Sequence, residues 1–290
     1  MPPIPPPRES GYTTTTDVPL YWCTYGEPAA SRVVIVHGGP GASHDYLLPQ
    51  MLRLANGREL VFYDQRGGGR SRVDAGAPVT WQLHVEDLAR VARELRAEPL
   101  VVVGYSWGGL LALLHAVEAA SGRVPISPET LLLIDPAPAS RRYRAEFETE
   151  FARRQASPEV QRLREELAAS GLRERDLEAY RQRAFELSVA GYFADPAAAR
   201  DLTPFRVVGR VQQSVWKSLG DYDVVPQLSS VECRACVVHG RQDPIPLASS
   251  GAYARALGAR LVVLDRCGHV PYVEQSDALF EVAEAFLGHP

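Results

Sequence analysis

The sequence predicts an α/β fold with a mostly parallel sheet, flanking helices and one helical segment inserted between two of the strands. Short apolar, β-branched runs alternate with segments whose apolar residues recur at helical spacing. A long middle segment, rich in Arg, Glu and Ala, contains no strand-like run. With 46% hydrophobic and 23% charged residues over 290 positions, the chain has the composition of a packed globular protein rather than of a disordered one.

The apolar runs have the length and residue types of buried strands. Their alternation with helical segments is typical of a parallel sheet whose strands are joined by crossover helices. The predicted strands are residues 32–36, 60–63, 100–103, 131–134, 236–238 and 261–264, and the predicted helices are 81–95, 107–120, 247–257 and 278–287. Both ends of the chain therefore contribute to one sheet.

The helical segment from about residue 140 to about residue 226 interrupts that sheet. It begins just after the strand ending at 134 and ends just before the strand at 236. We therefore expect a core in two parts, residues 1–139 and 227–290, with a helical cap at residues 140–226 between them. A lid over one edge of the sheet is the favoured interpretation. The alternative is a solvated helical surface with no part in chemistry.

Composition excludes several classes of protein. The net charge is only −4 and charges of both signs are mixed along the chain, which argues against nucleic-acid binding. No apolar stretch is long enough to span a membrane, and the first ten residues lack the pattern of a secretory signal, so we expect a cytoplasmic protein. The four cysteines include one CxxC, Cys233 and Cys236, without a second ligand pair. We expect strand packing there, and no metal or organic cofactor.

A candidate nucleophile lies in the run GYSWG at residues 104–108. This G-x-S-x-G follows a predicted strand and precedes a predicted apolar helix, which is the context of a nucleophile elbow. A serine at such a corner has a strained backbone and needs small neighbours. The corner exposes the hydroxyl of Ser106 and directs the backbone N–H of Trp107 to the same space, where an oxyanion would form.

A serine hydroxyl needs a base, and His269 is the best placed of the seven histidines. It lies in a glycine-containing loop after the strand 261–264, at the same sheet edge as Ser106. The base needs a carboxylate to orient it. Asp243 follows the strand 236–238 and gives the chain order Ser, Asp, His. Asp135 also follows a strand and is the alternative, although Asp243 is favoured.

A glycine-rich loop, HGGPG at residues 37–41, follows the first predicted buried strand. Its glycines let the backbone approach a substrate closely and leave N–H groups exposed, so it is the expected source of a second oxyanion donor. It completes neither a dinucleotide-binding fingerprint nor a P-loop.

The chain resembles the proline iminopeptidase family of α/β-hydrolases, which includes the tricorn-interacting aminopeptidases. The residues that carry the resemblance are HGGPG at 37–41, DQRGGGRS at 64–71, GYSWGG at 104–109, GRQDP at 240–244 and GHVPYVEQSD at 268–277. They cover the sheet portions on both sides of the insertion. The resemblance implies Ser106, Asp243 and His269 as the triad and the N–H groups of Gly39 and Trp107 as the oxyanion hole. We therefore expect an α/β-hydrolase fold with an eight-stranded, mostly parallel sheet and an inserted helical cap.

In that family, glutamates of the cap hold the free amino group of the substrate. Glu146, Glu148 and Glu150 are the candidates here, and Glu146 and Glu150 would share one helix face. A solvated face is the alternative for such a charged run. Glu274, just after the histidine loop, is a further substrate-binding candidate, with a structural hydrogen bond as its alternative.

The function expected from these residues is acyl transfer through Ser106. The favoured reaction is an aminopeptidase of the proline iminopeptidase type, which would release N-terminal residues from short peptides or amides. A carboxylesterase acting on small acyl esters is the first alternative, and a non-catalytic binding protein on the same fold is the second. A small molecule or short peptide is the expected partner in each case, and the sequence leaves the oligomeric state open.

Overall fold

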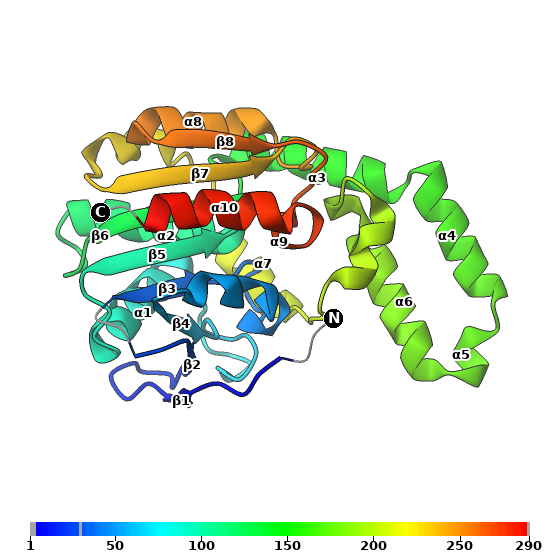
Figure 1. The fold of residues 1–290 in the computed structure, drawn as a ribbon, viewed down its shortest axis with the longest axis horizontal. Coiled ribbons are helices and arrows are strands. Elements are labelled where there is room, and N and C mark those ends of the chain that lie inside the picture. The colour runs from blue at the N-terminus through cyan, green and yellow to red at the C-terminus, as the bar shows by residue number, and fades with distance from the viewer. Residues whose placement is uncertain (1–3, 29–30, 289–290) are drawn as a thin grey trace.

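A computed structural model describes residues 4–28 and 31–288 and confirms the eight-stranded, mostly parallel sheet with flanking helices. The strand order is β1-β2-β4-β3-β5-β6-β7-β8 (Figure 1). β1 and β2 are antiparallel to their neighbours, and the six remaining strands run parallel. The strands are β1 (Glu9–Tyr12), β2 (Tyr21–Tyr25), β3 (Arg32–Val36), β4 (Glu59–Tyr63), β5 (Leu100–Tyr105), β6 (Pro128–Ile134), β7 (Arg234–Gly240) and β8 (Arg260–Leu264).

The two antiparallel strands are those that the apolar pattern does not identify. β1 has the sequence ESGY and is largely exposed, and β2 has the sequence YWCTY, in which aromatic and polar residues replace an aliphatic run. A strand near the edge of a sheet needs no continuous apolar sequence, because only part of its surface is buried.

Alternation along the buried strands separates two layers of core. In β3, Val34 and Val36 pack on one face, whereas Val33 and Ile35 pack on the other. The first face is covered by α1 (Trp81–Glu94), α2 (Trp107–Ala120) and α8 (Leu247–Leu257). The second is covered by α10 (Ser276–Leu287) and by short 3₁₀ helices at His44–Leu47 and Gln50–Ala55. The sheet lies between these two layers and is packed on both faces. This packing holds the ends of its strands in fixed positions.

Between β6 and β7 the chain forms only helices and irregular segments, apart from an isolated bridge between Ser140 and Asp223. In Figure 1, α4, α5 and α6 project away from the sheet, while α3 and α7 lie beside it. The helices of this insertion are α3 (Arg141–Gln155), α4 (Pro158–Ala169), α5 (Leu172–Arg175), α6 (Leu177–Val189) and α7 (Gly209–Leu219), with 3₁₀ turns at Ala190–Tyr192, Pro196–Asp201 and Val225–Ser230. A short helix, α9 (Pro271–Glu274), precedes α10.

The two cysteines of the CxxC pair lie in β7 or directly before it. Cys236 is buried in β7 and Cys233 is half-buried just before it, and both are free thiols. Within residues 4–28 and 31–288, no helix has both the length and the apolar character that crossing a bilayer requires.

Candidate active site

Ser106 occupies a sharp corner between β5 and α2. Its backbone has φ 53° and ψ −119°, a region that residues with a side chain rarely adopt. The glycines beside it are required by space, because a Cβ on Gly108 would lie 2.0 Å from the carbonyl oxygen of Val36 and one on Gly104 would lie 2.6 Å from that of Gly108. The close packing of strand and helix thus presents the serine hydroxyl at the end of the sheet.

His269 joins this serine to a carboxylate. Its Nε2 lies 2.9 Å from Ser106 Oγ, and its Nδ1 lies 2.8 Å from Asp243 Oδ2. An ionised carboxylate only accepts hydrogen bonds, so Nδ1 carries the proton and Nε2 is free to accept from the serine hydroxyl. The three residues follow β5, β7 and β8, and the parallel sheet brings these strand ends to one edge.

Asp135, the alternative carboxylate, is a buried neighbour of Asp243 rather than a partner of His269. It follows β6 with a φ of 41°, and its Oδ1 accepts a 2.8 Å hydrogen bond from the N–H of Gly240. An oxygen of Asp135 lies within 4.8 Å of one of Asp243. The structure therefore places Asp243, and not Asp135, in hydrogen-bond contact with the histidine.

Burial shifts the pKa of all three groups. It raises the pKa of both carboxyls, and repulsion from Asp243 adds to the effect at Asp135. Asp243 accepts hydrogen bonds from His269 and from the N–H of Ile245, and such bonds favour the ionised carboxylate. Burial also lowers the pKa of His269 below its usual range, so the ring is neutral at pH 7 and able to accept a proton.

Two tyrosines hold the histidine loop in place. The hydroxyl of Tyr105 donates to the carbonyl oxygen of His269 at 2.8 Å, and the N–H of His269 donates to the carbonyl oxygen of Tyr192 at 2.7 Å. Both tyrosine rings lie against the imidazole, with centroids 5.3 and 5.2 Å away. Tyr105 belongs to the GYSWG run and was within reach of sequence analysis. Tyr192 comes from the insertion and carries no such signal.

The glycine-rich loop and the elbow are linked by Gln65. The indole N–H of Trp107 donates to Gln65 Oε1 at 2.8 Å, and Gln65 Nε2 donates to the carbonyl oxygen of His37 at 2.6 Å. Gly39, with a φ of 60°, and Trp107 both line the cavity in front of Ser106. Gln65 lies in the DQRGGGRS run, so this motif acts on the site by positioning the two candidate oxyanion donors.

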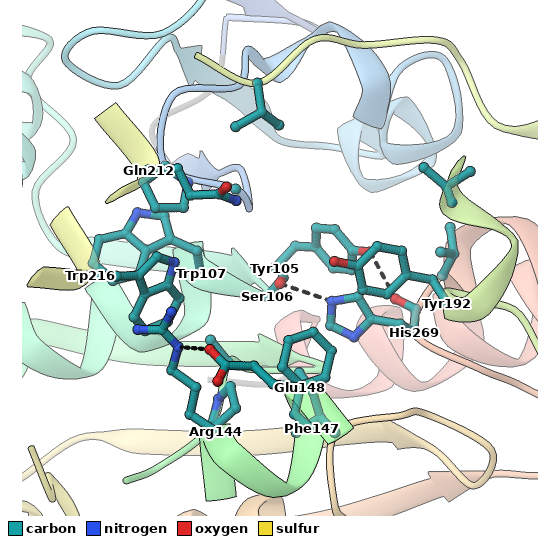
Figure 2. Close-up of a pocket in the computed structure, with 18 of the residues that line it drawn as sticks. Tyr105, Ser106, Trp107, Arg144, Phe147, Glu148, Tyr192, Gln212, Trp216 and His269 are labelled. Atoms are coloured by element: carbon teal, nitrogen blue, oxygen red, sulfur yellow. Dashed lines mark hydrogen bonds and ion pairs between the residues drawn. The ribbon is translucent and has the colours of Figure 1, made fainter. Parts of the chain in front are cut away.

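A cavity of about 760 Å³ lies over Ser106 and His269 (Figure 2). Its walls come from the sheet edge and from the insertion, chiefly α3, α7 and the segment around Tyr192. Aromatic side chains dominate, and they include Tyr46, Tyr105, Phe147, Tyr192, Phe205, Trp216 and Tyr272. The volume suits a small ligand.

The three glutamates predicted on α3 differ in whether they line the cavity. Glu148 lines the cavity, but Glu146 and Glu150 do not. Both pair instead with arginines of α3: Glu146 with Arg142, and Glu150 with Arg153 and Arg154. These two residues therefore fit the alternative interpretation, a solvated helix face. Only part of the circumference of α3 faces the cavity, and neither residue lies on that part.

Glu274 also lies outside the cavity lining. Its carboxylate accepts hydrogen bonds from the backbone N–H groups of Gly268, Ala194 and Asp195 at 2.7 to 3.1 Å. These bonds tie the loop of the histidine to the insertion, which corresponds to the structural alternative for this residue.

One buried group among the described residues has the composition of a metal site. It comprises Asp135, His239 and Asp243, whose ligand atoms lie within 4.8 Å of one another. Hydrogen bonds already engage them, because Asp243 accepts from His269 and from the N–H of Ile245, and His239 Nδ1 lies 2.9 Å from Ser250 Oγ. These bonds explain the cluster as a polar network behind the histidine.

Comparison with known proteins identifies the family and the fold. Residues 33–282 match the alpha/beta hydrolase family. A proline iminopeptidase of Saccharolobus solfataricus is 25% identical over 96% of this chain and 92% of its own length. One from Lacticaseibacillus rhamnosus is 32% identical, but over 46% of this chain and 44% of its own. The crystal structure of a Mycobacterium smegmatis proline iminopeptidase superposes with a TM-score of 0.69 at 23% identity, covering 97% of this chain and 98% of that one.

Proposed function

The chain belongs to the alpha/beta hydrolase family, in a proline iminopeptidase-like branch, and from this premise we propose that it is a serine hydrolase with Ser106 as nucleophile. The observation that carries the proposal is the continuous hydrogen-bonded series from Ser106 through His269 to Asp243, at the floor of a cavity. A neutral imidazole between a hydroxyl and a buried carboxylate is the arrangement that activates a serine.

The proposed reaction has two halves. Nε2 of His269 takes the proton of Ser106 as Oγ attacks the acyl carbon, and the N–H groups of Gly39 and Trp107 stabilise the oxyanion. His269 then gives the proton to the leaving group. Water, deprotonated by the same histidine, releases the acid from the acyl-enzyme.

Reaction with a fluorophosphonate probe tests the nucleophile. Wild type should be labelled, Ser106→Ala should not, and Ser121→Ala should be labelled like wild type because that serine lies at the far end of α2. Equal labelling of wild type and Ser106→Ala would contradict the assignment. Absence of labelling in wild type would favour the non-catalytic binding protein.

The finer proposal is an aminopeptidase that acts on short peptides or amides, and it is supported by the proline iminopeptidases to which the chain is similar. Turnover of proline and alanine naphthylamides should be compared with that of 4-nitrophenyl acetate and butyrate on one preparation. Amide cleavage that depends on Ser106 would support the aminopeptidase. Rapid ester hydrolysis without amide cleavage would contradict it.

One observation favours the second candidate, a carboxylesterase. Among the described residues that line the cavity, Glu148 is the only one with a carboxylate, and it lies 2.8 Å from Arg144 and 3.5 Å from Arg141. A carboxylate shared by two guanidinium groups is poorly available to a substrate amine. The comparison of amides with esters distinguishes the two candidates.

A further inference from the structure

Lys217 is the only lysine among the 31 lysine and arginine residues of the chain, and it lines the cavity in front of Ser106. It lies in the last turn of α7, is exposed, and forms no ion pair with any residue that the structure describes. All five arginines on the neighbouring helix α3, by contrast, pair with glutamates of the same helix. The ammonium of Lys217 is therefore a charge without a partner at the cavity wall.

Two arginines add to this positive charge. Arg144 holds its guanidinium 4.1 Å from the ring centroid of Trp216 and forms an ion pair with Glu148, with Nε 2.8 Å from Oε1. Arg141 reaches the same glutamate at 3.5 Å. With His269 neutral, three cations and one carboxylate line this cavity, which leaves an excess of two positive charges.

Stacked rings connect the charged wall to the serine corner. Trp216 packs edge-on against Trp107, with centroids 5.3 Å apart, and Trp107 directly follows Ser106. Figure 2 shows Arg144 and Trp216 on the side of Ser106 opposite to His269. Because the histidine delivers a proton to the leaving group, that group lies beside the histidine, and the part retained on the serine extends toward the opposite wall.

We propose that this cationic wall, formed by Arg141, Arg144 and Lys217, binds a carboxylate on the acyl part of the substrate. A guanidinium fork and an ammonium are the usual protein partners of a carboxylate. The inference rests on the proposed nucleophile, Ser106. It concerns the charge of the acyl group and applies to an amide or an ester alike.

The test compares two esters that share a leaving group, 4-nitrophenyl butyrate and the mono-4-nitrophenyl ester of glutaric acid. Wild type should show at least a fivefold higher kcat/KM for the glutarate ester, corrected for its spontaneous hydrolysis. Lys217→Gln should reduce kcat/KM for the glutarate ester by about fivefold, mainly through KM, and leave the butyrate ester unchanged. Lys217→Arg should restore the preference, and added salt should weaken it.

Arg142→Gln is the matched control. It removes one positive charge from α3, but Arg142 is 82% exposed and lies outside the cavity lining. Its kinetics with both esters should equal those of wild type. Equal kcat/KM for the two esters in wild type, or an equal loss with both in Lys217→Gln, would overturn the proposal. A preference found only for a carboxylate on the leaving group, as in 4-acetoxybenzoate against phenyl acetate, would overturn it too.

A second measurement needs no turnover. Glutarate should slow the labelling of Ser106 by a neutral fluorophosphonate in wild type and not in Lys217→Gln. It should also protect Lys217 from trinitrobenzenesulfonate, and peptide mapping can follow this because the chain has no other lysine. If Ser106 is labelled and glutarate does not slow the labelling, the carboxylate site is contradicted, but the proposed nucleophile is not. Failure of Ser106 to react at all contradicts the proposed function instead.

Discussion

The sheet and the helical insertion place functional residues by different physical rules. In the sheet, burial is nearly complete along β3 to β7, and each candidate catalytic residue follows the end of one strand. In the insertion, α3 has no fully buried residue, and its glutamates and arginines pair with one another along the helix. Position in the sheet is thus determined by packing, whereas the role of a charge on α3 depends on which way it faces.

The position of a functional residue is therefore easier to predict in the sheet than in the insertion. A buried parallel strand has one position in its sheet, so the residue after it has a predictable place. An exposed helix with charges on all sides could be rotated about its axis with the same sequence pattern. The pattern therefore does not indicate which charged residue faces the cavity. Four predictions, set in the sheet, in the insertion or in both, test this view.

The largest effect should come from the two carboxyls at the sheet edge. Asp243→Asn should lower kcat toward a 4-nitrophenyl ester by about 10⁴-fold, because the amide NH₂ can donate to Nδ1 and hold the imidazole in the wrong tautomer, and the negative charge that stabilises the imidazolium is lost. Asp135→Asn should lower it less than tenfold, since the histidine bonds to Asp243 and an amide oxygen at position 135 can still accept from Gly240. Equal losses in the two variants would contradict the assignment of Asp243.

The next effect concerns glycines of the two regions. Gly108→Ala should lower the free energy of unfolding by about 3 kcal/mol, because its Cβ would lie 2.0 Å from a backbone oxygen of β3. Gly171→Ala, at a φ of 63° before α5, should cost about 1 kcal/mol, since its Cβ would meet only an arginine nitrogen at 3.9 Å. Urea denaturation measures both. A larger cost at Gly171 would contradict the contrast in packing.

A buried pair in the core should show a pH-dependent effect. His44 Nδ1 lies 2.7 Å from Asp64 Oδ1. Although burial opposes it, the hydrogen bonds of His44 with Asp64 and Cys23 raise its pKa to about 9. A pKa raised on folding stabilises the protein below about pH 6.5, and the contribution is lost as the pH rises through 9. His44→Gln should therefore cost about 2 kcal/mol at pH 6 and clearly less at pH 10.

Urea denaturation of wild type and His44→Gln at the two pH values checks this prediction. Glu146→Gln, at an exposed pair of the insertion, is the control and should change stability by less than about 0.5 kcal/mol at either pH. A constant gap between wild type and His44→Gln would show that the charge of His44 does not contribute.

The smallest effect is expected for substrate binding by the two paired glutamates. Glu146→Gln and Glu150→Gln should each change kcat/KM by less than about twofold with both naphthylamides and 4-nitrophenyl esters, because neither residue lines the cavity. A tenfold loss confined to the amide substrates would restore these residues as amine-binding groups. It would also mean that α3 turns toward the cavity when substrate binds.

The sequence was most informative where burial and backbone strain act together. The runs at 32–36 and 100–103 predicted strands because a continuous apolar run rich in β-branched residues is typical of the middle of a parallel sheet. The glycines around Ser106 predicted the corner because no side chain fits there. The strands β1 and β2 were missed because their partly exposed positions impose no apolar pattern.

Other site residues were missed because their roles depend on long-range contacts. Gln65 links the glycine-rich loop to the serine elbow through hydrogen bonds that no local sequence pattern predicts. Tyr192 supports the histidine from a segment nearly 80 positions away in the chain. Glu148 differs from Glu146 only in the direction it faces, and that direction follows from the packing of α3.

By itself the sequence determined the parallel sheet, the insertion and the placement of Ser106, Asp243 and His269 at strand ends, because burial and chain geometry restrict these features locally. Only the tertiary structure decided that Asp243 rather than Asp135 contacts the histidine, and that Arg141, Arg144 and Lys217 line one cavity. The physical reason is that the side-chain environment of a charge depends on neighbours distant in the chain. Such neighbours are set by how the insertion packs on the sheet.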